Sequence, residues 1–377
     1  MIDRMLGAPG PSKRSDRAGG LGHHRQMPST APLAIGGHRL TWPELPLALR
    51  HALEAAVGSP VVGAVSKEGG FSPALASVLT LADGTAVFAK AVNVSRNEFA
   101  VEALRREWVV LAGLPDDVPA PRLRWTFDDG DWVAMVIDAV DGRNPVQPWR
   151  SEELERFLEV ATVLARRLSP SPIPAPVLAE GAASFTNWAA LAAERVASER
   201  AADGRAVADR AVAEPASTEC ATAECATPGH GAFERWWRAH AEQLIALERL
   251  WSAAAAGTAL LHGDLRSDNV LLTRHGFVVV DWPAVAIGAP WLDLVFSLPS
   301  VAMHGGGDPQ ELWRRHPLSR GVDPDAVNSA LASIAGFFIA RSREPAPPLL
   351  PTIREFQRAQ GAAALAWLGR RLGWRPA

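Results

Sequence analysis

The stretch from Leu261 to Asp293 reads LHGDLRSDNVLLTRHGFVVVDWPAVAIGAPWLD and contains polar residues at a distinctive spacing. Asp264 is followed five residues later by Asn269 and then by a short apolar run. A second apolar run leads directly to Asp281. Two short apolar runs separated by a polar turn predict a pair of strands. The pattern therefore predicts that Asp264, Asn269 and Asp281 are presented by one loop and two short strands.

This set of side chains suits metal-assisted phosphoryl transfer. One carboxylate would orient an attacking hydroxyl, while the amide and the second carboxylate would hold Mg²⁺ against nucleotide phosphates. Two other interpretations remain. The His262-Gly-Asp264 segment could be a turn capping a hairpin, with Asp281 merely ending a strand. A metal hydrolase would need further His or carboxylate ligands, and His275 is the only other candidate in the segment.

Lys90 is notable because lysine is rare in this chain. Only three of the 38 Lys and Arg residues are lysines. Lys90 ends a strand-like run, Thr85–Lys90, which an Asp-Gly turn separates from the run Leu75–Leu81. Asp-Gly between two such runs predicts a β-hairpin. A compact ammonium at this position can reach nucleotide phosphates, although it could also be an exposed charge at a strand end.

A helix is predicted downstream of this hairpin, over Glu98–Leu111, from its amphipathic pattern. Glu107, seventeen residues after Lys90, is the predicted partner of the lysine. Glu98 and Glu102 are the alternatives, and each could instead belong to a solvated helix face.

A glycine turn is predicted just before the hairpin, at Glu68-Gly-Gly-Phe-Ser-Pro73. The backbone of Gly69 and Gly70, followed by Ser72, can approach phosphate oxygens closely. The pattern is not a P-loop, because the Lys-Ser/Thr ending is missing and a strand rather than a helix follows. Adjacent glycines are also ordinary turn residues.

The spacing H-x-D-x-x-x-x-N followed by D-x-x resembles the catalytic loop and metal-binding motif of kinases. With Gly263 after the His and Trp282 after Asp281, the chain more closely resembles the aminoglycoside phosphotransferase/choline kinase-like family. The resemblance spans roughly residues 60–300. It implies an α+β, two-lobed protein kinase-like fold, with a small β-rich N-lobe and a larger, mainly helical C-lobe. Asp138–Gly142 resembles the hinge where the nucleotide base rests.

The resemblance also implies residue roles and the cofactors ATP and Mg²⁺. The implied set comprises a catalytic base (Asp264), metal ligands (Asn269, Asp281), nucleotide-binding residues (Lys90, Glu107, Gly69, Gly70, Ser72) and supporting residues (His262, Asp293). Asp293 would brace the catalytic loop, or alternatively would be only a carboxylate at a helix N-terminus. The interval between Asp281 and Asp293 has no long activation segment, which favours a small-molecule acceptor over a protein.

The expected organisation is a disordered tail (1–32), an N-lobe (33–140) and a C-lobe (141–377). The C-lobe contains an Ala-rich segment, 203–231, that is expected to be a frayed helix or a flexible insertion. One long helix is expected over Phe233–Ala256, with Trp236, Leu244, Leu247 and Trp251 in its core face. Further helices are predicted near residues 45–57, 152–168, 309–316, 325–342 and 351–372. The tryptophans are expected to pack in the core rather than to form a stacking platform.

Composition excludes several classes of protein. The net charge of −3 and the absence of a basic block argue against nucleic-acid binding. No apolar run reaches the ~20 residues that span a bilayer. Cys220 and Cys225 are expected to be free thiols in a cytoplasmic protein.

The predicted function is ATP-dependent phosphorylation of a hydroxyl on a small molecule, an antibiotic or a metabolite. The alternatives are a non-catalytic nucleotide-binding pseudokinase and, less favoured, a kinase that acts on proteins; the oligomeric state is left open.

Overall fold

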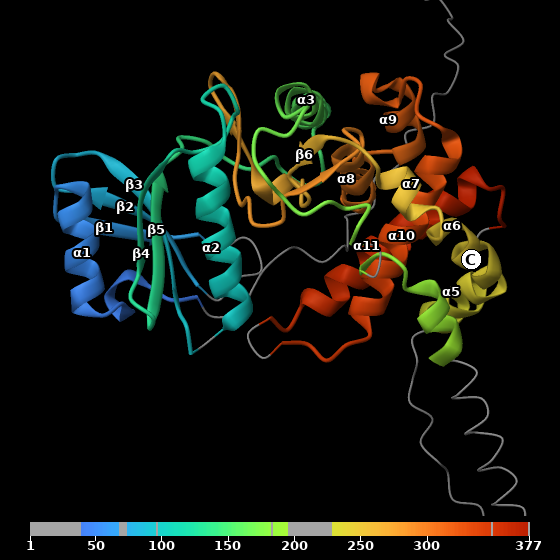
Figure 1. Cartoon of the computed structure of the whole chain (residues 1–377), viewed down its shortest axis with the longest axis horizontal. Coiled ribbons are helices and arrows are strands. Elements are labelled where there is room, and N and C mark those ends of the chain that lie inside the picture. The colour runs from blue at the N-terminus through green and yellow to red at the C-terminus, as the bar shows by residue number, and fades with distance from the viewer. Residues whose placement is uncertain are drawn as a thin grey trace, which may run out of the picture.

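The computed structural model describes residues 39–67, 74–95, 97–181, 184–194, 228–347 and 350–375. The expected tail, the glycine turn with Gly69, Gly70 and Ser72, and residues 203–227 of the expected insertion lie outside these ranges. Residues 228–231 of that segment form the first turn of helix α5 (Pro228–Ala239). The chain folds into a β-rich N-lobe and a larger, mainly helical C-lobe (Figure 1). The predicted α+β fold is thereby confirmed.

The N-lobe is built on a five-stranded antiparallel sheet with the order β1-β2-β3-β5-β4. The predicted Asp-Gly hairpin joins β2 to β3. The edge strand β1 was not predicted, since its exposed side chains give no alternating pattern. The strands are β1 (Val61–Ser66), β2 (Leu75–Leu81), β3 (Ala86–Asn93), β4 (Leu123–Asp128) and β5 (Trp132–Asp138).

A helix covers each face of this sheet, because successive side chains of a strand point to opposite faces. Ala89 and Ala91 of β3 belong to one apolar cluster with Leu49 and Leu53 of helix α1 (Leu47–Val57). Val92 packs on the other face in the cluster that includes helix α2 (Glu98–Gly113). Figure 1 shows α2 on the side of the sheet that faces the C-lobe. Lys90 therefore lies on the face that α2 covers.

The C-lobe consists of helices and two short antiparallel strand pairs. The two longest helices, α10 and α11, pack against each other. Short strands β6 and β9 pair, as do β7 and β8. The helices are α3 (Ser151–Arg167), α5 (Pro228–Ala239), α6 (Ala241–Glu248), α7 (Trp251–Ala255), α8 (Leu292–Met303), α9 (Pro309–Arg315), α10 (Pro324–Ser342) and α11 (Ile353–Arg371); the strands are β6 (Ala259–Leu261), β7 (Val270–Thr273), β8 (Gly276–Val279) and β9 (Ala286–Gly288). Short 3-10 turns occur at Trp42–Glu44, Ser267–Asn269 and Pro317–Ser319.

The prediction of one helix over Phe233–Ala256 is wrong, because the segment is divided among α5, α6 and α7. The breaks lie at His240 and near Leu250. Trp237 rather than Trp236 is fully buried, and Leu247 is only half-buried, whereas Leu244 and Trp251 are buried as predicted.

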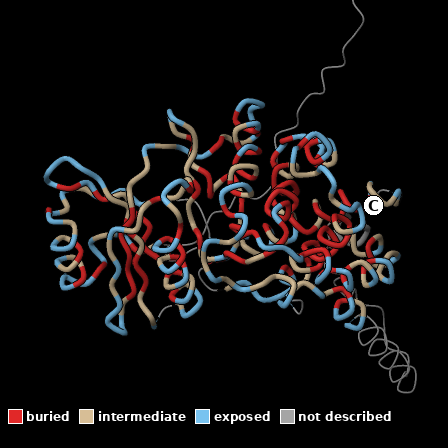
Figure 2. Tube along the Cα trace, turned by 45° about the horizontal axis from the view of Figure 1, so that its top comes forward, coloured by how far each residue is buried: buried red, intermediate tan, exposed pale blue. Residues whose placement is uncertain are grey.

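Tryptophans form much of the C-lobe core. Figure 2 shows many buried residues along the trace of the C-lobe helices. The fully buried tryptophans are Trp188, Trp237, Trp251, Trp282 and Trp367. Their predicted role in packing is confirmed. Among the described residues, no helix combines the length and the apolar character needed to cross a membrane.

Candidate active site

The polar motif of the sequence forms a loop between β6 and β7 that a buried carboxylate holds in place. Asp293, in the first turn of α8, accepts hydrogen bonds from the backbone N–H of His262 (2.8 Å) and of Gly263 (2.9 Å). The His262 ring is completely buried, and its Nε2 lies 3.1 Å from the carbonyl oxygen of Val280. Burial lowers the pKa of His262. Asp293 is thus both a residue of a first helical turn and a support of the loop.

Gly263 occupies a position that only glycine fits. Its φ of 77° is in the left-handed region. A Cβ added there would lie 2.2 Å from the carbonyl oxygen of Ala284. The loop therefore passes directly against the chain that follows Asp281, and a side chain at 263 would separate the two.

Asp264 is held by two neighbours, one at each carboxylate oxygen. Arg266 donates to Oδ1 (2.5 Å), and Asn269 Nδ2 donates to Oδ2 (3.2 Å) and to the Asp264 carbonyl (2.8 Å). Burial raises the pKa of Asp264 to about 7; Arg266 opposes this shift, whereas the charges of Asp268 and Asp281 add to it. A carboxyl group that titrates near neutral pH suits a general base.

Arg266 and Asp268 form a second charged pair in the same loop. The Arg266 guanidinium donates to both carboxylate oxygens of Asp268, at 3.0 and 2.9 Å. The guanidinium also lies over the ring of Phe356 in α11, 5.5 Å from its centre. This cation thus connects the loop to the C-terminal helices. Arg266 was not predicted as a site residue from the sequence. Its position inside the motif, two residues after Asp264, could have indicated it.

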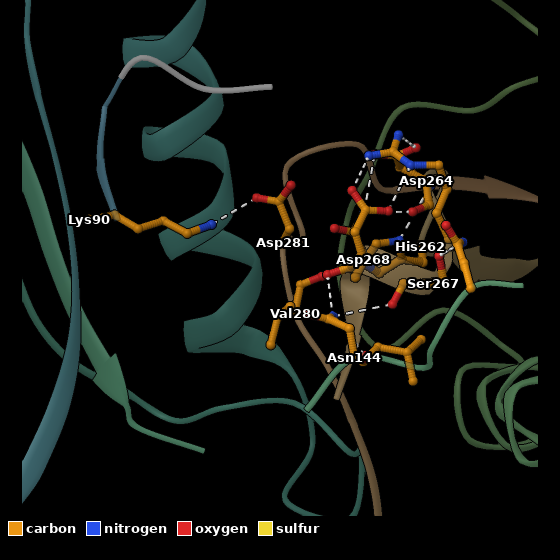
Figure 3. A network of polar contacts seen from close by, with 12 residues as sticks. Lys90, Asn144, His262, Asp264, Ser267, Asp268, Val280 and Asp281 are labelled. Atoms are coloured by element: carbon orange, nitrogen blue, oxygen red, sulfur yellow. Dashed lines mark hydrogen bonds and ion pairs between the residues drawn. The ribbon is translucent and has the colours of Figure 1, made fainter. Parts of the chain in front are cut away.

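The N-lobe contributes Lys90, which points toward Asp281 across the space between the lobes (Figure 3). Lys90 Nζ donates to both oxygens of Glu107, at 2.8 and 2.6 Å, and to Asp281 Oδ1 at 2.7 Å. Burial alone would lower the pKa of Lys90, but the two carboxylates raise it overall. Partial burial would raise the pKa of Asp281, but the same contact lowers it overall. Glu107, rather than Glu98 or Glu102, is the residue that contacts the lysine.

Asp281 has a backbone conformation that is rare for a residue with a side chain. Its φ is 68°, and it is the only non-glycine residue with positive φ in the described part of the chain. Such conformations are unfavourable and cluster at functional sites. The side chain of Asp281 is 45% exposed, while its partner Lys90 is 17% exposed. The carboxylate is therefore charged and accessible.

The residues present fit a Mg²⁺–nucleotide complex. Mg²⁺ is usually bound by one or two protein oxygens together with substrate phosphates. Asp281 offers an ionised carboxylate. Asn269 offers its Oδ1, because its Nδ2 is turned toward Asp264. The described residues contain no cluster of three or more His, Cys, Asp or Glu side chains that would hold a metal without such a ligand.

A β-rich lobe with a Lys–Glu pair, joined to a helical lobe with this loop, defines the protein kinase-like fold. A model of the phosphotransferase enzyme family, APH, matches residues 68–326. The chain belongs to this family, and the predicted resemblance is confirmed.

Solved structures show the same fold at low sequence identity. The crystal structure of aminoglycoside phosphotransferase APH(4)-Ia has 15% identity and a TM-score of 0.53, with 86% of this chain and 98% of that chain covered. A thermostable mutant of that enzyme, in a ternary complex with AMP-PNP and hygromycin B, also has 15% identity and a TM-score of 0.53, and covers 86% of this chain and 99% of its own. A search of the curated proteins gave no match.

The structure brings together the predicted site residues that it describes: Lys90, Glu107, His262, Asp264, Asn269, Asp281 and Asp293. Asn144, which contacts the loop from outside the motif, was not predicted. Nothing in the local sequence around Asn144 could have indicated a contact with residues more than 120 positions away.

Proposed function

We propose that this protein transfers the γ-phosphate of ATP to a hydroxyl group of a small molecule. The observation that carries this proposal is the meeting of two groups of residues between the lobes. Lys90 and Glu107 come from the N-lobe, and Asp281 and the Asp264 loop come from the C-lobe. Family membership supports phosphotransfer as the reaction class. The nucleotides ADP and AMP-PNP in the solved relatives support ATP as the donor.

Asp264 acts as the base in the proposed reaction. The acceptor hydroxyl gives its proton to the Asp264 carboxylate while its oxygen forms a bond to the γ-phosphorus. The bond between the γ-phosphorus and the oxygen that bridges to the β-phosphate breaks, and ADP leaves with that electron pair. Asn269 and Arg266 orient the carboxylate through the hydrogen bonds described above. A pKa of about 7 keeps a large fraction of Asp264 ionised at neutral pH.

Lys90 binds the nucleotide phosphates, and Glu107 keeps its ammonium in position. In the ligand-free state Asp281 neutralises Lys90, so phosphate oxygens would take over this contact when nucleotide binds. Asn269 and Asp281 would hold Mg²⁺, which would supply positive charge next to the phosphates. The glycine turn at residues 69–72 remains a proposed phosphate contact.

The acceptor is proposed to be a small molecule because little chain separates Asp281 from the C-lobe core. Strand β9 begins at Ala286 and helix α8 at Leu292. Protein kinases use a longer segment between their metal-binding Asp and the next motif to regulate activity and receive a polypeptide. This chain has no room for such a segment.

A direct test is Mg²⁺-dependent formation of ADP from ATP with a mixed panel of hydroxyl metabolites and antibiotics. We expect turnover with at least one acceptor, and we expect Asp264→Ala to reduce it by ~10²–10⁴-fold, the usual contribution of a positioned base. ATP binding to this variant should be nearly unchanged. Wild-type protein that binds Mg²⁺–ATP but turns over no acceptor would favour the pseudokinase alternative. Turnover of Asp264→Ala within a few-fold of wild type would exclude Asp264 as the base.

A further inference from the structure

We propose that Asn144 is a positioning residue that holds the catalytic loop from the segment joining the two lobes. The proposal deepens the proposed function and rests on it, because it assigns a residue that keeps Asp264 and Asn269 in place. Asn144 follows strand β5 and the irregular segment 139–142, so it belongs to the connection between the lobes.

The Asn144 side chain makes three contacts to the loop through one atom. Its Nδ2 donates to the carbonyl oxygens of Ser267 (3.2 Å), Asp268 (2.9 Å) and Val270 (3.0 Å) (Figure 3). Backbone carbonyls can only accept hydrogen bonds, so the amide nitrogen, and not the oxygen, must face them. The two N–H groups of this amide are shared among three carbonyls, of which that of Ser267 also accepts the backbone N–H of Val270.

Two of these carbonyls, those of Ser267 and Asp268, belong to the irregular part of the loop, and the third belongs to Val270, the first residue of β7. Ser267–Asn269 is a single 3-10 turn between the catalytic Asp264 and strand β7. Backbone oxygens in such a turn have no sheet partner to fix their direction. Asn269, within this turn, holds Asp264 through its Nδ2. A change in the turn would therefore move both the metal ligand and the base.

The segment that carries Asn144 is itself fixed to the C-lobe. The buried Glu153 of α3 accepts hydrogen bonds from Arg143 (2.6 Å) and from the N–H of Val146 (2.7 Å). The backbone of Arg143 exchanges two hydrogen bonds with Leu272 of β7, at 3.1 and 2.7 Å. The connecting segment and the loop are thus one hydrogen-bonded unit.

A neighbouring side chain adds to the same contact. Gln147 Nε2 donates to Ser267 Oγ at 2.6 Å. Asn144 and Gln147 together hold both the backbone and the side chain of the 3-10 turn. Any shift of the connection between the lobes would be transmitted to the loop through these two amides.

The experiment compares Asn144→Ala with Asn144→Asp. Alanine removes the donor. Aspartate keeps nearly the same shape but places a carboxylate oxygen against three carbonyl oxygens. If Asn144 acts by donating hydrogen bonds, the Asp variant should be at least as impaired as the Ala variant. Asn187→Ala is the matched control, because the Asn187 amide also donates to a backbone carbonyl, that of Ser184 at 3.0 Å, away from the site.

The first readout is hydrogen–deuterium exchange of the peptide that covers residues 264–272 in the ligand-free full chain. We expect exchange in this peptide to rise by about tenfold in both Asn144 variants, with other peptides unchanged, since the lost hydrogen bonds act locally. Gln147→Ala should produce a smaller increase in the same peptide. If an Asn144 variant does not fold, exchange in the Gln147→Ala variant tests the proposal instead.

The second readout is the pH profile of kcat together with KM for ATP. We expect kcat to fall by about tenfold or more, KM for ATP to change less, and the midpoint of the profile to move from its wild-type value. A merely structural residue would lower the amount of active protein without moving that midpoint.

Exchange at residues 264–272 that matches wild type in both Asn144 variants would overturn the proposal. So would an Asp variant that behaves like wild type. Because exchange needs no turnover, absence of phosphotransfer in the wild type would refute the proposed function without deciding the role of Asn144. The two failures are therefore distinguishable.

Discussion

Asp264 is the residue whose environment is most closely tied to the proposed chemistry. Burial raises its pKa to about 7, and Arg266 limits that rise. Since only the ionised carboxylate accepts a proton, kcat should increase with pH through about 7 and then level off.

Arg266→Gln should move this midpoint to higher pH, because it removes the cation that opposes the shift. The measurement is kcat with saturating ATP and acceptor from about pH 5.5 to 9, a range that brackets the expected pKa. A midpoint that stays in place or moves to lower pH in Arg266→Gln would contradict this account. The substitution also leaves Asp268 without its guanidinium partner, and the charge of Asp268 raises the pKa of Asp264 in the same direction.

Asp281→Asn should damage nucleotide binding rather than proton transfer. The substitution removes the anionic ligand for Mg²⁺ and leaves Lys90 with only one carboxylate partner. We expect weaker binding of Mg²⁺–ATP in calorimetry, in contrast to Asp264→Ala, whose nucleotide affinity should be retained. Equal affinity of Asp281→Asn and wild type for Mg²⁺–ATP would show that the metal assignment is wrong.

Gly263→Ala tests whether the loop must lie directly against the chain after Asp281. The matched control is Gly130→Ala, since Gly130 also has positive φ (90°) but has nothing within 4 Å of an added Cβ. The control should lose ~1–2 kcal/mol of unfolding free energy from the left-handed backbone alone. Gly263→Ala should lose clearly more, because its Cβ would overlap the Ala284 carbonyl. Equal losses of unfolding free energy in the two variants, measured by urea unfolding, would argue against the clash.

At the scale of elements, Glu248 of α6 joins two helices of the C-lobe. Its buried carboxylate accepts hydrogen bonds from the N–H groups of Trp188 (2.8 Å) and Ala189 (3.1 Å). These two residues begin an earlier helical segment, at residues 188–194. Glu248→Ala would leave these donors without their partner, which costs ~1–3 kcal/mol for each buried group. We expect a lower melting temperature with kcat and KM unchanged.

Glu248→Gln provides the control, since its oxygen can still accept one of the two bonds and its loss of stability should be smaller. Unchanged melting of Glu248→Ala would indicate that water satisfies these N–H groups. If kcat fell in Glu248→Ala at a temperature where the variant is fully folded, Glu248 would also influence the candidate active site, an effect that its hydrogen bonds do not predict.

The elements that the sequence predicted well are those with a strong local pattern. The β2–β3 hairpin followed from its Asp-Gly turn, and helices α3, α10 and α11 lie within a few residues of their predicted bounds. Strands β6 and β9 were missed because three residues carry no period, and their pairing joins distant segments. The breaks between α5, α6 and α7 have no glycine or proline to mark them.

The residues of the candidate site likewise fall into those that a local sequence pattern predicts and those that it does not. Lys90, Asp264, Asn269 and Asp281 could be predicted because the chemistry requires those residue types at a fixed spacing. Asn144 could not, since an amide that binds backbone carbonyls imposes no pattern on the residues it contacts. Whether a residue acts on a distant loop depends on tertiary geometry, which local sequence does not encode.

At the scale of the whole molecule, the two lobes share one apolar core. The cluster that contains Leu104 and Val110 of α2 continues into α3 and the helices of the C-lobe, whereas α1 and the outer face of the sheet form a separate cluster. Figure 1 shows α2 between the sheet and the C-lobe. Helix α2 carries Glu107, so the position of Lys90 depends on how this helix packs against both lobes.

The charges of the C-terminal helices bear on the acceptor. Residues 301–377 contain six acidic residues and ten arginines. Glu311 pairs with Arg314, and Glu344 pairs with Arg341 and Arg354. Asp308 and Asp323 cap the N-termini of α9 and α10. Four of the six acidic residues are therefore engaged within the protein.

Aminoglycosides should be poor acceptors for this reason, despite the family to which the chain belongs. They are polycations, and a pocket that binds them should present clustered carboxylates. A neutral or anionic hydroxyl compound, or a bulky antibiotic of low charge, should be phosphorylated more efficiently. The measurement compares kcat/KM for a kanamycin-like compound with that for neutral sugars and polyols at equal ionic strength. A value for the aminoglycoside within the ~10⁴–10⁸ M⁻¹s⁻¹ of ordinary enzymes would overturn the prediction. It would also require carboxylates other than Asp308, Glu311, Asp323 and Glu344 to converge on the acceptor.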